Sequence, residues 1–229
     1  MKRFALWIVV ILAMSAQAST ANSATSRPAE LKPQQQQARA ATIATQVLTQ
    51  YHYKAVPLDD SMSERVFDNY LKTLDPERLY FVQADIDELS CHRTSLDDAI
   101  AKEDLSAPFE IFNRFTQRVS EQFAFAQSLL KDGFDFAKNE TYSLERSKST
   151  WPASDTEMRE LWQKRVKNDW LALKLAGKDD DGIRAMLAKR YEAAVKRMAK
   201  IQSADAFFYK IQVFFSAYLV GDHENILDT

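Results

Sequence analysis

Two pairs of neighbouring side chains, Ser147 with Lys148 and Cys91 with His92, have the residue types that support nucleophilic catalysis. A serine and lysine pair needs a deprotonated lysine and an oxyanion hole made of backbone donors. Ser147 and Lys148 lie in a polar stretch without a glycine, where the lysine stays solvated and protonated. Adjacent residues of a helix do not face each other, so Cys91 and His92 do not form a nucleophile with its base. We therefore predict that the chain contains no catalytic residue.

Metal-binding side chains are also present, but their spacing is wrong for a known site. The acidic run Asp179–Asp181 precedes Gly182, whereas an EF-hand needs alternating acids, a glycine at the sixth position and an acid at the twelfth. His52 and His223 lie far apart, and neither belongs to an H-E-x-x-H helix. The single cysteine, Cys91, allows no intrachain disulfide, and we expect a buried thiol. We predict helix capping by the acids, and neither a metal nor a cofactor.

Glycine is scarce, since the chain has 4 glycines in 229 residues and average usage is about 7%. Strand-rich domains, phosphate loops and oxyanion turns all need glycine. The scarcity favours an all-α fold and argues against an internal active site. The formal net charge of -2 differs from the strongly basic charge that is typical of nucleic-acid-binding proteins, so we expect no nucleic-acid partner.

The N-terminus has the three parts of an export signal. Lys2 and Arg3 precede the apolar segment 4–14, and an A-x-A cleavage site ends at Ala18. The apolar segment is shorter than the ~20 residues that cross a bilayer. We predict a signal peptide over residues 1–18, a flexible lead over 19–33, and export to the periplasm with no membrane span after cleavage.

Apolar periodicity predicts an elongated all-α domain of about six to seven helices, with one long ordered loop, over residues 34–221. A divergent tail, residues 222–229, follows it. The first predicted helix runs from about Gln34 to Tyr53. Its expected buried face consists of Ile43, Val47, Leu48 and Tyr51.

The second predicted helix starts at Ser61, where Glu64 completes a capping box, and it stops before Pro76. Its expected core residues are Val66, Phe67, Tyr70, Leu71 and Leu74. The apolar connection 79–82 fits either a buried turn or the start of a helix. A third helix then begins near Asp85, where acids favour a first turn. Its expected face is Ile86, Leu89, the stem of Arg93, Leu96 and Ile100.

The fourth predicted helix begins at Ser106 as its cap, and Gly133 ends it. It has the broadest apolar stripe: Ile111, Phe112, Phe115, Val119, Phe123, Ala126, Leu129 and Leu130. Two amphipathic helices follow, the first between the capping box of Ser154 with Glu157 and the stop at Gly177, the second after Asp181. The last predicted helix begins near Ser203. It is nearly apolar all round, so we expect it to bury against protein.

A polar loop, residues 139–153, separates the fourth and fifth predicted helices. It contains Tyr142, Leu144 and Trp151, side chains that a disordered linker has little reason to hold, so we expect it to pack on the domain. We take Tyr142, Arg146 and Trp151 as candidate contacts with a partner.

Three segments together resemble the N-terminal region of the tail-specific proteases, the carboxy-terminal processing serine peptidases of the bacterial periplasm. They are the string TYSLERSKSTWP with the helix after it, the segment Tyr51–Ile86, and the segment Arg190–Phe207. The similarity covers about residues 45–210. It is specific because of its extent, although none of its pieces is a catalytic motif.

The resemblance implies a function for a larger protein. Family members continue into an Asp-Pro-His-Thr stretch, a PDZ domain and a protease core with a catalytic serine and lysine, whereas this chain has VFFSAYLVGDHENILDT. Asp222 and His223 lack the proline of that stretch. We interpret the chain as the N-terminal scaffold or docking domain of such a protease, truncated or frame-shifted before the core and inactive alone. Its expected partners are the protease core or an adaptor protein, with protein substrates reached through the full-length enzyme. The alternative is a complete, non-catalytic binding or regulatory module.

Overall fold

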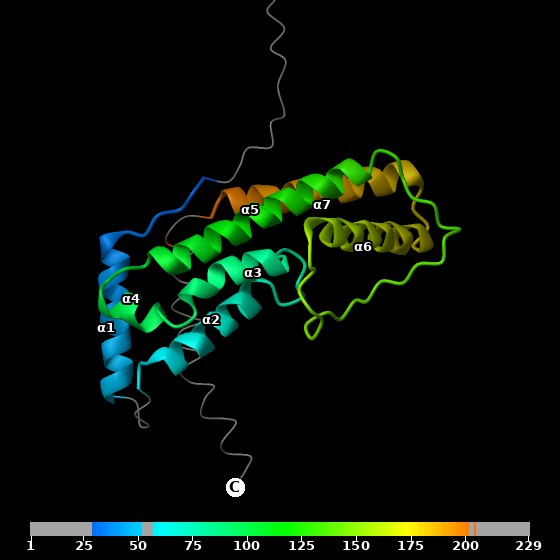
Figure 1. Cartoon of the computed structure of the whole chain (residues 1–229). Coiled ribbons are helices and arrows are strands. Elements are labelled where there is room, and N and C mark those ends of the chain that lie inside the picture. The colour runs from blue at the N-terminus through cyan, green and yellow to red at the C-terminus, as the bar shows by residue number, and fades with distance from the viewer. Residues whose placement is uncertain (1–28, 52–56, 202–203, 205–229) are drawn as a thin grey trace, which may run out of the picture.

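The computed structural model describes residues 29–51, 57–201 and 204, and every regular element in them is helical (Figure 1). The predicted all-α fold is therefore confirmed. The predicted signal peptide, the last predicted helix apart from Ala204, the divergent tail, His52 and His223 lie outside the described residues. The elements are α1 (Gln35–Tyr51), α2 (Asp60–Leu74), α3 (Gln83–Leu89), the 3-10 turn η1 (Ser90–His92), α4 (Leu96–Ala101), α5 (Ser106–Leu129), α6 (Asp155–Leu175) and α7 (Asp180–Ala199).

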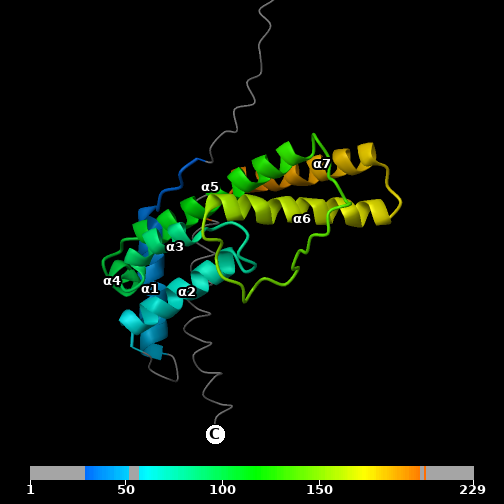
Figure 2. The same ribbon diagram turned by 45° about the vertical axis from the view of Figure 1, so that its right-hand side comes forward.

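Helix α5 runs through the middle of an elongated arrangement. Its C-terminal half packs against α6 and α7, and α2, α3 and α4 lie along its N-terminal half (Figures 1 and 2). Helix α1 stands at the far end, beside α4, and crosses the direction of α5 at a steep angle. The long loop from α5 to α6 passes around the outside of this frame.

Two hydrophobic clusters form the core, and α5 contributes to both. Phe109 and Phe112 belong to the first cluster, with α1 to α4, whereas Ala126 and the adjoining Leu130 belong to the second, with α6 and α7. Because these residues lie on one continuous helix, the two clusters are held in a fixed relation. The predicted apolar stripe of α5 is thus confirmed as core, although Phe115, Phe123 and Leu129 are only partly buried.

Helix α2 has the predicted core face but a different cap. All five expected side chains are buried, and Met62 joins them. The helix begins one residue earlier than predicted, because the carboxylate of Asp59 accepts a hydrogen bond from the backbone N–H of Met62. The predicted capping box of Ser61 with Glu64 is therefore wrong; an Asp cap satisfies the first turn instead.

The predicted third helix is wrong as a single element, since it is broken into α3, η1 and α4. The hydroxyl of Ser90 donates to the carbonyl of Asp87, which tightens the chain at the end of α3. Helix α4 then starts against α2, where the hydroxyl of Ser63 accepts from the N–H of Asp97 and donates to its carboxylate. This long-range pair sets the direction of α4, and local periodicity does not reveal it.

The predicted buried face of α1 is also wrong. Ile43 is 61% exposed and Val47 is 52% exposed, whereas Ala38, Ala41 and Thr45 are buried. The hydroxyl of Thr42, on the inner side, donates to the carbonyl of Ile100 in α4 at 3.0 Å. Small residues allow the two helices to approach closely, so the larger apolar side chains face outward. The side chains of Leu48 and Tyr51 lie outside the described ones.

The ends of the remaining helices largely follow the predictions. The hydroxyl of Ser154 accepts from the N–H of Glu157, and Gly177, with φ +80°, ends α6. Asp179 caps α7 by accepting from Gly182, as predicted for the acidic run. Ser106 does not act as a cap; its N–H is instead bound by the carboxylate of Asp104 at 2.8 Å.

One leucine of the second cluster and one exposed leucine outside it together test the contribution of the cluster to stability. Leu187 on α7 is fully buried, whereas Leu175 on α6 is 79% exposed. We expect Leu187→Ala to lower the free energy of unfolding by about 2–5 kcal/mol, because a cavity replaces packed methyl groups. Leu175→Ala should change it by less than about 0.5 kcal/mol. Urea denaturation of the full chain, followed by tryptophan fluorescence, measures both; equal effects would contradict the assigned core.

Candidate functional site

The turn after α2 is organised by one buried carboxylate. Asp75 is 1% exposed, and it accepts three backbone hydrogen bonds, from Leu79 at 2.7 Å, Tyr80 at 2.9 Å and Phe81 at 3.0 Å. Burial raises the pKa of Asp75 above its usual value, and the three N–H donors and the charge of Arg146 oppose this rise. The carboxylate holds the connection 79–82 as a compact buried turn, which confirms one of its two predicted forms.

The loop between α5 and α6 closes over this turn through Trp151. The Trp151 ring meets Phe81 edge to face, with centroids 5.9 Å apart, and the guanidinium of Arg78 lies 5.2 Å from the Trp151 centroid. Arg78 also donates to the carbonyl of Ser149. The carbonyl of Pro152 accepts from the N–H of Gln83 at 2.8 Å. The predicted packing of the loop on the domain is therefore confirmed at its C-terminal end.

Other parts of the loop differ in their burial. The backbone N–H of Arg146 donates to the carboxylate of Glu77 at 2.6 Å, and the Nε of Arg146 is buried without a hydrogen-bond partner among the described residues. Tyr142 is half-buried. Leu144 is 76% exposed, so its predicted packing is wrong. The loop is thus held at Arg146 and Trp151, and its middle is presented to solvent.

A polar cavity of about 290 Å³ lies where the loop meets α2 and α3. The residues around it include Lys72, Asp75, Arg78, Arg93, Ser147 and Trp151. Two of its arginines have local partners: Arg93 pairs with Asp68 at 2.8 Å, and Arg78 donates to the loop carbonyl of Ser149. Ser147 is an exposed residue at its edge, and Lys148 does not line it. The arrangement serves the closure of the loop, and it does not combine Ser147 with Lys148 in one pocket.

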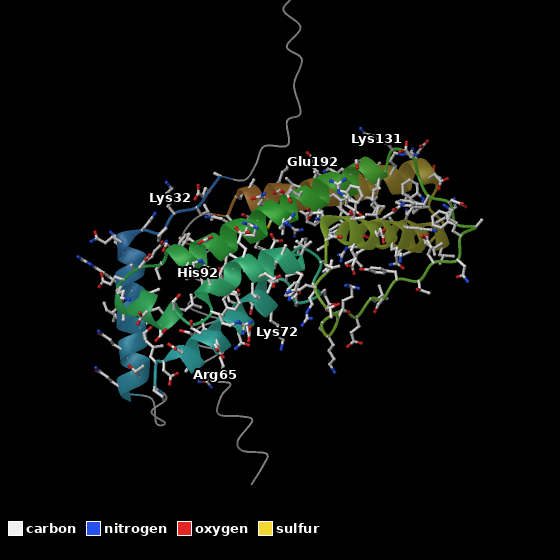
Figure 3. The ribbon with its side chains drawn as sticks, in the orientation of Figure 1. Lys32, Arg65, Lys72, His92, Lys131 and Glu192 are labelled. Carbon is white, nitrogen blue, oxygen red and sulfur yellow. The ribbon has the colours of Figure 1, made fainter. Side chains whose placement is uncertain are left out.

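Cys91 and His92 point to different partners. The Sγ of Cys91 donates to the carbonyl of Glu88, whereas Nε2 of His92 lies 2.9 Å from the carboxylate of Glu110 on α5 (Figure 3). The thiol and the imidazole therefore contact different neighbours. The prediction of a buried thiol is wrong, because η1 places Cys91 at the exposed surface.

The acidic run before α7 is used within the fold. Asp179 caps the helix, Asp180 pairs with Lys174 at 3.0 Å, and Asp181 pairs with Arg184 at 2.8 Å. Across residues 29–51 and 57–201, no cluster of three or more histidine, cysteine or acidic side chains is arranged to hold a metal ion. Within the same residues, no helix combines the length and apolarity needed to cross a bilayer.

The loop and the turn beneath it lie inside a region that matches a known family. A family model described as the tail specific protease N-terminal domain matches residues 44–218. The chain belongs to the tail-specific protease family. It is 38% identical over 176 residues to the tail-specific protease of Haemophilus influenzae. The aligned region is 76% of this chain but 25% of that relative, so the chain spans about a quarter of the length of the curated relative it matches.

The residues that carry the tail-specific protease resemblance coincide with those that close the loop. Ser149, Trp151 and Pro152, from the string TYSLERSKSTWP, contact Arg78, Phe81 and Gln83. On the other side of the turn, Nε1 of Trp162 in α6 donates to the carbonyl of Leu79 at 2.6 Å. The segments that resemble the family therefore contact one another through both backbone and side-chain atoms.

A second buried carboxylate of this tail-specific protease domain connects α3 to α5. Asp85, 1% exposed at the start of α3, binds Arg114 at 2.6 Å and Arg118 at 2.8 Å, both on α5. Burial raises the pKa of Asp85, but the hydrogen bonds from Arg118, the N–H of Val82 and Arg114 outweigh it and hold the pKa below its usual value. Local sequence indicates only that Asp85 is an acid in the first turn of a helix. The two arginines lie about one helical turn apart on α5, and the packing of α3 against α5 brings both to one carboxylate.

The contribution of the Asp75 carboxylate to the turn can be tested by removing its acceptor oxygens. We expect Asp75→Ala to lower the free energy of unfolding by about 3 kcal/mol or more, because buried N–H groups of the turn lose their partners. Asp68→Ala is the control, since Asp68 is 56% exposed and its ion pair with Arg93 should contribute about 0–1 kcal/mol. Chemical denaturation of the full chain compares them. A similar loss in both variants would contradict the assigned role of Asp75.

The ion pairs of Asp85 with Arg114 and Arg118 predict that the stability of the domain falls at acid pH. A carboxyl whose pKa is lowered by folding stabilises the domain above its unfolded pKa of about 4, and this contribution is lost as the pH falls below that value. We expect Asp85→Asn to destabilise the chain by about 2 kcal/mol at pH 7 and to flatten the fall in stability below pH 4. Asp98→Asn, which removes an exposed ion pair with Lys102, should keep the wild-type slope. Urea midpoints from pH 2 to 7 provide the measurement; an unchanged slope in Asp85→Asn would exclude this role.

Proposed function

We propose that this chain forms the helical N-terminal scaffold and docking domain of a periplasmic tail-specific serine endopeptidase. The family cleaves proteins near their C-termini, and by this proposal the chain alone is not catalytic. The observation that carries the proposal is the match of residues 44–218 to the N-terminal domain of this family. The match to about a quarter of the relative supports a role as one part of a larger enzyme.

The use of the polar residues supports a scaffold. Asp75 and Asp85, the most buried carboxylates among the described residues, are engaged by backbone donors and by arginines of the same domain. Buried carboxylates whose hydrogen bonds are satisfied within the domain make its structure rigid. A rigid frame of this kind suits a domain that holds a protease core or an adaptor at a defined position.

The loop over the Asp75 turn is a candidate contact region in this proposal. Tyr142, Arg146 and Trp151 are each partly exposed, and the neighbouring Leu144 is presented to solvent. Arg146 and Trp151 are held by contacts with the turn below, so a partner would meet a surface that is partly preformed. Export with cleavage before Ser19, a lead over residues 19–33 and a helical domain over 34–221 complete the proposal.

Proteolysis assays test the proposal at two levels. The full chain alone should not hydrolyse an unfolded protein with an apolar C-terminus, whereas the H. influenzae relative should. A chimera in which this chain replaces the aligned region of that relative should regain proteolysis compared with the relative lacking the region. The physical reason is that the scaffold positions a core that the chain itself does not supply.

Two results would count against the proposal. Hydrolysis by the purified chain, blocked by a serine-directed inhibitor, would contradict the non-catalytic role. A folded chimera no more active than the deletion would contradict the scaffold role and favour the alternative, a self-contained periplasmic binding or regulatory module.

A further inference from the structure

Helix α1 has an outer face with almost no charge. Arg39 is the only charged residue in its 17 positions, although 27% of the whole chain is charged. Ile43 and Val47, four positions apart, lie on the outer face with 61% and 52% of their surface exposed. Figure 3 shows side chains of α1 projecting away from the other helices. A surface helix usually carries charge on its solvent side, so this face is unusual.

An uncharged groove continues from this outer face. It is lined by side chains of α1 on one wall and by the segments before α2 and at the end of α4 on the other, and none of its lining residues is charged. Its volume is about 560 Å³, and the lining includes Thr42, Thr45, Gln46, Leu58, Ile100 and Ala101. Gln46 lies on α1 between the exposed pair and the groove. The exposed pair Ile43 and Val47 and the groove therefore form one continuous surface, which we call the α1 surface.

We infer that the α1 surface docks an amphipathic helix from the remaining part of the tail-specific protease, with the apolar face of that helix against Ile43, Val47 and the groove. The inference rests on the proposed function. Depletion of charge marks the centre of protein interfaces, and a helix laid into an apolar groove is a recurrent mode of recognition. The relative has three quarters of its length outside the aligned region, which supplies the candidate partner.

The size of the α1 surface favours a tethered partner over a second copy. A helix of 17 residues is about 25 Å long and 10 Å wide, so it offers only a few hundred Å². A stable complex of freely diffusing proteins buries about 800 Å² on each partner. A partner in the same polypeptide needs less contact, because its effective concentration is high.

A second exposed apolar pair provides the matched control. Leu171 and Leu175 on α6 are also four positions apart, with 39% and 79% of their surface exposed. The charged residue Lys174 stands between them, paired with Asp180. This pair therefore lies beside a salt bridge, whereas the α1 surface has one charged residue nearby, the exposed Arg39 one turn before Ile43. We expect the α6 pair to remain exposed in the assembled protease.

Cysteine labelling measures which of the two pairs becomes covered. Val47→Cys and Leu175→Cys are each made in a Cys91→Ser background, because Cys91 is exposed. Each is labelled with a maleimide in the full chain and in the chimera that carries the rest of the H. influenzae protease. We expect Val47→Cys to react about tenfold more slowly in the chimera than in the full chain, and Leu175→Cys to react equally in both.

Three outcomes decide the inference. Equal labelling of Val47→Cys in a folded chimera and in the full chain overturns it, and if that chimera still cleaves substrate the proposed function stands. Protection of Val47→Cys in the full chain alone, increasing with concentration, overturns it in favour of a second copy. Should the chimera not fold, cysteine at the aligned position of the natural H. influenzae protease must be protected in the same way, and free labelling there overturns the inference.

Discussion

The buried carboxylate of Asp75 is the interaction on which the rest of this domain depends. Its three backbone hydrogen bonds fold the turn after α2, so that Phe81 enters the first hydrophobic cluster and Val82 enters the second. Trp162 then fixes the same turn to α6 through the carbonyl of Leu79. A side chain with only apolar atoms at position 75 would satisfy none of these N–H groups, which is why a polar hub stands where the two clusters meet.

The ion pairs of Asp85 attach α5 to the start of α3, next to the turn that Asp75 holds. Asp85 receives Arg114 and Arg118 from the middle of α5, the helix that crosses both clusters. The Asp85 carboxylate is buried, so removing its arginine partners would leave a desolvated charge without compensation. Together the two carboxylates determine how α2, α3, α5 and α6 meet.

Several residues of the family-like segments are those that close the loop over the turn after α2. Trp151 and Pro152 close the loop over the turn, and their partners Phe81 and Gln83 lie in another of the similar segments. The type of residue at such a position is constrained by several neighbours at once. By contrast, α1 at the end of the frame meets few constraints from within, and its composition is better explained by a partner outside the described domain.

Local sequence determined the helices, most of their ends and the core face of the amphipathic ones, because these depend on neighbours within one or two turns. The stop at Gly177, the cap at Ser154 and the buried face of α2 are of this kind. The exposure of Ile43, the break between α3 and α4, and the ion cluster of Asp85 were decided by tertiary structure. Each depends on a contact between residues far apart in the chain, such as Thr42 with Ile100 or Ser63 with Asp97, and periodicity carries no information about which helix will lie opposite.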